Sequence, residues 1–203
     1  MPSPAFRVGF VPGVMPDKWA RRWAEQRREP LELVPLDEDT DPPALLREGR
    51  LDMCLLRLPV AGDDLHLVRL YDEQPVVVVS RENAVAAYDE IDVADLADEH
   101  LLQDPDEVPA WRDVAREVRD GSRYPVPTMT TGQTIESVAA DAGVAVLPMS
   151  VARAHHRKDV VAVPVTGVGP TTVALVWLRD RDDGTCQAFV GVVRGRTRNS
   201  SRG

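Results

Sequence analysis

The sequence predicts an α/β protein whose sheets are mostly parallel. Short apolar runs typical of strands alternate along the chain with stretches whose apolar residues recur at helical spacing. Strands that alternate with helices favour parallel sheets with right-handed crossovers. Hydrophobic residues make up 43% of the 203-residue chain but aromatic residues only 5%, so the core is expected to be mainly aliphatic.

The first part of the chain alternates predicted strands with two helices. The first helix is expected to begin at Pro16, with Trp19 and Trp23 on its inner face because they lie four residues apart. The second helix covers 42–49 and ends at Gly49. Apolar runs predict strands at 6–11, 31–36, 51–59, 67–71 and 74–80.

After Ser80 the sequence becomes more polar, and its predicted elements are shorter. Asp92 is expected to cap one or two helical turns over 92–99. Apolar residues at helical spacing around Trp111 predict a single helix over 108–120. The remaining predictions are strands at 100–103, 125–130, 144–147, 160–165 and 171–178, a short helix at 150–156 and a last helix at about 185–194.

The stretch "TTGQ" at 130–133 matches the pattern of a helix-capping box. Thr130 would cap the backbone of Gln133, and the Gln133 side chain would return to the backbone of Thr130. Gly143 is expected to supply the left-handed residue that ends this helix.

The start of this helix is also a candidate ligand-binding turn. In open α/β sheets, ligands bind beyond the carboxyl ends of strands, where helices present free N–H groups. Thr131 would supply a hydroxyl and Gly132 an unobstructed N–H. The alternative is that the cap serves only the helix.

Charge and composition argue against several classes of protein. A net charge of −9 does not favour nucleic-acid binding through the overall field. No apolar run has the length of a membrane helix, and the start lacks a secretory signal, so the protein is expected in the cytoplasm. Residues 194–203 form a basic tail, expected to be disordered; the alternative is a contact with DNA, RNA or an acidic partner.

Motifs for catalysis or metal binding are weak. The chain has no GxSxG, no HExxH and no phosphate loop. The adjacent His155 and His156 are expected to be a solvated pair, and His66 and His100 stand alone. Cys54 and Cys186 form no CxxC and are expected to be buried thiols; a redox switch between them is the alternative. We therefore expect no cofactor, no metal and no enzymatic activity.

Five stretches, taken in order, carry a family resemblance: "FRVGFVPG", "LREGRLDMCLLRLP", "LVRLYDEQPVVVVS", "IDVADLADEHLL" and "SVAADAGVAVLPMSVA". Together they resemble the effector-binding (substrate-binding) domain of LysR-type transcriptional regulators, from about residue 5 to 193. The last stretch resembles the family's Ala-Gly-x-Gly pattern followed by a short strand and a proline. Val144 stands where that pattern has its second glycine.

The resemblance implies a fold like that of type 2 periplasmic binding proteins. Two Rossmann-like lobes with mostly parallel sheets would be joined by two crossover strands, and a small molecule would bind in the cleft. Lobe I would comprise 5–79 and 166–193, and lobe II would comprise 80–165.

The resemblance also implies ligand contacts on the loops that follow the strands. Arg57 would be the best group for an anionic ligand, because its fork can hold a carboxylate; the alternative is a surface salt bridge. Asp104, Asp106 and Glu107 form an acidic entry to the helix predicted over 108–120; they would act as partners of its N-terminal dipole, or else select a ligand that carries an amine. The expected contacts are Gly13, Val14, Met15, Arg57, Leu58, Gln103, Asp104, Thr130, Thr131, Gly132, Pro148 and Met149.

The implied function is that of a small-molecule effector-binding domain in transcriptional regulation. The family's helix-turn-helix precedes this domain, whereas here the first strand begins at about residue 6. We therefore expect a complete, stand-alone chain that does not read DNA itself and acts as a homodimer or with a full-length regulator. The expected effector is an organic acid or an amino acid. The alternatives are a cytoplasmic solute-binding protein and an enzyme on the same fold.

Overall fold

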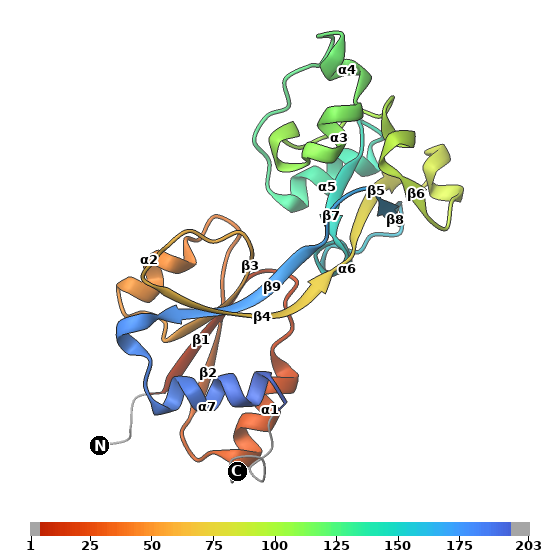
Figure 1. Cartoon of the computed structure of the whole chain (residues 1–203). Helices are drawn as coiled ribbons and strands as arrows, with labels where there is room; N and C mark the ends of the chain where they lie inside the picture. Colours follow the sequence, from red (N-terminus) through yellow and green to blue (C-terminus); the bar gives the residue numbers. More distant parts are fainter. Residues whose placement is uncertain (1–4, 196–203) are drawn as a thin grey trace. The chain divides into compact units, whose positions relative to one another are not determined.

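The computed structural model describes residues 5–195 and divides the chain into two compact units (Figure 1). The chain leaves the first unit between Asp72 and Glu73 and returns to it between Thr171 and Thr172. Within residues 5–195, no helix combines the length and the apolar character that a membrane crossing requires. The predicted basic tail lies outside the described residues from position 196 onward.

The first unit contains a five-stranded sheet in the order β2-β1-β3-β9-β4. Strand β1 pairs in parallel with β2 and β3, and β3 pairs antiparallel with β9. The strands are β1 (Phe6–Phe10), β2 (Leu31–Pro35), β3 (Met53–Arg57), β4 (Leu65–Glu73) and β9 (Thr171–Leu178). All five cover predicted strands, because each is an apolar run long enough to cross a sheet.

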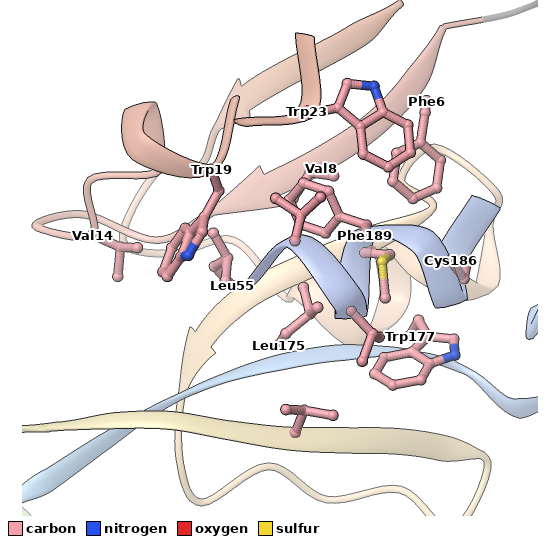
Figure 2. Packing of buried hydrophobic residues seen from close by; sticks show 14 of the residues in the cluster. Phe6, Val8, Val14, Trp19, Trp23, Leu55, Leu175, Trp177, Cys186 and Phe189 are labelled. Carbon is pink, nitrogen blue, oxygen red and sulfur yellow. The ribbon is translucent and has the colours of Figure 1, made fainter. Parts of the chain in front are cut away.

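Helices cover both faces of this sheet (Figure 1): α1 (Asp17–Gln26) and α7 (Gly184–Val193) lie on one face, and α2 (Pro42–Arg47) lies on the other. Side chains of β3 alternate between the two cores because successive strand residues point to opposite faces. Leu55 packs with Trp19 and Trp23, as predicted for those tryptophans, whereas Leu56 packs on the α2 side. Figure 2 shows the Trp23 ring beside Phe6, 5.5 Å between centroids.

The second unit contains a four-stranded sheet in the order β6-β8-β5-β7. The α/β class with two sheets is confirmed. The second sheet, however, pairs mainly antiparallel, whereas the sequence predicted mostly parallel sheets. Strand β5 pairs antiparallel with both β7 and β8, while β6 pairs in parallel with β8. The strands are β5 (Pro75–Ser80), β6 (Ile91–Asp92), β7 (Ala145–Pro148) and β8 (Val160–Thr166).

The lobe boundaries implied by the resemblance, 79/80 and 165/166, stay a prediction; the two structural units divide between residues 72 and 73 and between residues 171 and 172. Residues 76–80 of β5 pair with residues 160–164 of β8, and both strands belong to the second unit. The chain therefore enters the second unit before β5 and leaves it after β8.

Helices of the second unit are short. They are η1 (Ala84–Ala87), η2 (Val93–Leu96), η3 (Pro105–Glu107), α3 (Pro109–Val114), α4 (Arg116–Arg119), α5 (Thr131–Ala139) and α6 (Met149–Ala154). The single helix predicted over 108–120 is wrong, since Ala115 is extended and separates α3 from α4. At the break the N–H of Arg116 bonds the carbonyl of Ala97, 2.8 Å away.

Two predicted strands are absent or reduced. Residues 125–130 form no strand, because Pro125 and Pro127 have no N–H to give to a ladder. The strand predicted at 100–103 is reduced to one parallel bridge between Leu101 and Val144.

The end of α5 corrects the predicted role of Gly143. The left-handed residue is Asp141, with φ of 59°, and the N–H of Ala142 bonds the carbonyl of Ser137 in a Schellman pattern. Gly143 is required for a different reason, because a Cβ there would lie 2.4 Å from the carbonyl oxygen of His100.

Candidate functional site

The loop after β1 contributes a mixed set of predicted contacts in the first unit. Gly13 has φ of 82°, a conformation that favours glycine. Val14 is buried in the core, so its side chain supports the loop, whereas the Met15 side chain is 76% exposed. No side chain caps α1, because Pro16 occupies the cap position before Asp17.

Arg57 and Leu58 lie where β3 ends. The Arg57 guanidinium donates to the carbonyl of Pro12 at 2.8 Å, which ties the end of β3 to the loop after β1. Leu58 donates its N–H to the carbonyl of Thr172 and packs against the core on the α2 side. At least one Arg57 donor is thus committed to holding the loop.

The capping box predicted at the start of α5 is confirmed. The Thr130 hydroxyl accepts from the N–H of Gln133, and the Gln133 side chain accepts from the N–H of Thr130. A Cβ added at Gly132 would meet only the Thr130 hydroxyl, at 3.9 Å, so the backbone there is open to approach.

Gln103 and Asp104 follow the Leu101 bridge in the second unit. The side-chain oxygen of Gln103 accepts from the N–H of Val146, 2.6 Å away, and so extends the pairing of β7. Asp104 is exposed and accepts from the N–H of Asp106, 2.9 Å away, as the cap of η3. Asp104 thus caps η3, whereas the sequence led us to expect that it partners the helix predicted over 108–120.

A groove of about 360 Å³ opens beside these two residues. One wall is the connection between α4 and α5, which Figure 1 shows as an extended loop, and the other is the segment that contains η3. The groove lies within the size range of small-molecule sites. It is lined by Leu102, Gln103, Asp104, Pro105, Glu107, Arg123, Pro125, Val126, Pro127, Thr128, Met129 and Thr134.

Arg123 anchors the floor of this groove. Its guanidinium pairs with the Glu117 carboxylate and donates to the carbonyls of Leu101 and Gln103, both at 2.8 Å. It also lies 5.2 Å from the ring centroid of Trp111. His100, expected to stand alone, pairs with the same Glu117 carboxylate at 2.7 Å.

Pro148 and Met149 join β7 to α6. Met149 donates its N–H to the carbonyl of Gln74 at 2.9 Å, and its side chain packs against the core below α5. Beside them the Ser150 hydroxyl bonds the buried carboxylate of Glu73. This corner holds the chain where it enters the second unit.

A second hollow, of about 570 Å³, lies in the first unit near the amino ends of β1 and β3. Several of its charged groups have partners in the fold: Arg7 pairs with Asp52, and the Arg179 guanidinium donates to the carbonyl of Leu65. Asp182 accepts from the Trp177 ring nitrogen at 3.0 Å. It contains no residue predicted to contact a ligand.

The thiols are buried and unpaired with each other. Cys54 lies in the core on the α2 side, and Cys186 lies in the core with α7, so the sheet separates them. Burial raises the pKa of both thiols to about 12. Within residues 5–195, no group of three or more His, Cys, Asp or Glu side chains is arranged to hold a metal ion.

The sequence interpretation missed most of the groove. Arg123 and the wall residues Pro125, Val126 and Pro127 were not predicted contacts. The available signal was the Pro-x-Pro spacing, which is typical of a stiff, extended segment. Thr130, Thr131 and Gly132 lie next to the groove in sequence but are not among its lining residues.

Comparison with known proteins identifies the family. The model of the LysR substrate binding domain matches residues 2–198. No curated protein sequence matches the chain.

Solved structures share the fold at low identity. The Corynebacterium glutamicum OxyR C206 mutant is 21% identical with a TM-score of 0.68, over 95% of this chain and 64% of that one. The reduced OxyR regulatory domain from Pseudomonas aeruginosa is 20% identical with a TM-score of 0.69, over 96% of each chain. The BenM effector binding domain with its effector benzoate is 18% identical with a TM-score of 0.68, over 94% of this chain and 90% of that one.

The chain thus spans less than two thirds of the OxyR mutant but nearly all of the isolated regulatory domain. The family model matches nearly the full length of the chain and so covers both α/β units. The chain belongs to the LysR substrate binding domain family, the effector-binding domains of transcriptional regulators.

Proposed function

We propose that this chain binds a small-molecule effector in the groove of its second unit and acts in the cytoplasm, without catalysis. The bound state would pass to the transcription machinery through a full-length regulator or a second copy of this chain. A net charge of −9 disfavours sequence reading by its own surface. The remaining predicted contacts, Arg57 and Thr131 among them, stay proposals.

The assignment of effector binding to the groove rests on one observation. A hollow of about 360 Å³ is lined by Gln103 and Asp104, which were predicted to contact the effector. Its walls are well supported, because Gln103 bonds Val146 and Arg123 bonds two carbonyls of the facing segment. A preformed site of this kind loses little free energy to ordering when a ligand binds.

Thermal unfolding of the full chain against organic acids, amino acids and amines tests the proposal. A ligand at about 100 times its Kd adds about 2.7 kcal/mol of stability. At this chain length the midpoint should rise by several degrees, on the order of 5–10 °C.

A variant that fills the groove locates the binding site. Thr128→Trp places a large ring on an exposed wall residue, so the ligand-induced rise should disappear. Ser122→Trp adds the same ring to the exposed loop outside the groove and should keep the rise. A panel without any hit, or a full rise in the Thr128→Trp variant, would contradict the proposal.

A further inference from the structure

We propose that the effector of this groove is an organic cation, held through a protonated amine against an apolar wall. This inference rests on the proposed function, which supplies the existence of a small-molecule effector; the charges and the backbone of the groove decide its chemical class. The sequence led us to expect an organic acid or an amino acid, and it left a ligand that carries an amine as the alternative for this acidic segment.

Two carboxylates give the groove its charge. Asp104 and Glu107 both line it, and both are exposed. The Asp104 carboxylate accepts one backbone N–H, from Asp106, and so keeps acceptor positions for a ligand. The third acid of this segment, Asp106, forms an ion pair with Arg112, with 2.6 Å between its carboxylate oxygen and the guanidinium nitrogen.

The one cation of the lining is already neutralised. Arg123 pairs with Glu117, and two carbonyls take further donors of the same guanidinium. The positive charge of Arg123 is therefore already compensated by a carboxylate, so an anionic effector would gain less from it than from an unpaired guanidinium. The same effector would meet the carboxylates of Asp104 and Glu107, and like charges at close range are unfavourable.

Three prolines reduce the number of backbone donors in the walls. Pro105, Pro125 and Pro127 line the groove, and none of them has an N–H. The Pro105 carbonyl already accepts from the N–H of Val108, whereas the carbonyls of Pro125 and Pro127 can accept from a ligand that carries donors. A protonated primary amine carries three donors and no acceptor, as the Lys side chain does.

The same walls suit an apolar body attached to the amine. Leu102, Val126 and Met129 contribute aliphatic side chains to the lining. Apolar surface buried there would add to affinity in proportion to its area. Diamines, polyamines and arylalkylamines combine these two properties, whereas a small dicarboxylate has neither.

Calorimetric titration of the full chain tests the inference at about pH 7.5. The amine probes are putrescine, spermidine and phenethylamine, and the acid probes are benzoate and succinate. The test variant carries Asp104→Asn and Glu107→Gln, changes that keep shape, and asparagine can still cap η3. The control variant carries Asp95→Asn and Glu90→Gln, which remove the same charge from exposed residues outside the groove.

The inference predicts that at least one amine binds about tenfold more tightly than either acid. The test variant should weaken that amine by about tenfold or more, and the control variant by less than about twofold. Amine binding that survives in the test variant overturns the inference. Tighter binding of an acid also overturns it but leaves the proposed function standing. If none of the five probes binds, the inference falls, and the wider thermal panel decides separately on the proposed function.

Discussion

At the scale of single residues, the structure gives several side chains partners that the sequence does not reveal. The side-chain oxygen of Gln103 continues the hydrogen bonding of β7, and Arg57 holds the carbonyl of Pro12. Residue type and position predict that such groups are polar and lie at strand ends. They do not predict which backbone atom lies within reach, because that depends on how distant loops pack.

The two cysteines support a prediction at this scale. Their thiols should react with an aromatic disulfide reagent at about pH 8 only after denaturation, because burial raises both pKa values to about 12. A thiol with that pKa is about one part in ten thousand thiolate at this pH, and the thiolate is the reactive form. Rapid native-state reaction of either thiol, measured by released chromophore, would show that it is accessible.

At the scale of elements, apolar runs and capping residues predicted strands and a helix start correctly. Several predictions made in proline-containing or polar stretches failed. Strands β1, β3, β5 and β9 follow from short, mainly apolar runs, and the α5 capping box could be predicted from four residues. The strand predicted over 125–130 failed because its prolines cannot donate to a ladder. Because this segment does not join a sheet, it is able to form one wall of the groove.

The turn after α5 supports a second prediction. Gly143→Ala should lower the free energy of unfolding by about 1–3 kcal/mol, because the new methyl group would overlap the carbonyl of His100. Gly132→Ala is the matched control; it has open space around its Cβ and should be neutral or slightly stabilising in α5. Urea unfolding measures both, and equal midpoints for the two variants would contradict this account of Gly143.

At the scale of the whole molecule, the sequence predicted two α/β units and the family but not the groove. Each unit has cores on both faces of its own sheet, which alternating strand residues make predictable. The groove needs contacts between residues about twenty positions apart, such as Arg123 with Leu101. No local pattern encodes such a contact, so the family resemblance led to a loop that includes Gln103 and Asp104 without showing the shape of the groove.

Hydrogen–deuterium exchange with the ligand that raises the melting temperature most would test the central claim directly. The account predicts slower exchange over 102–107 and 123–134, the two walls of the groove. Exchange should stay unchanged around Arg7 and Cys186, which line the hollow of the first unit. Protection confined to that hollow, or none in either wall, would contradict the claim that the second unit holds the effector.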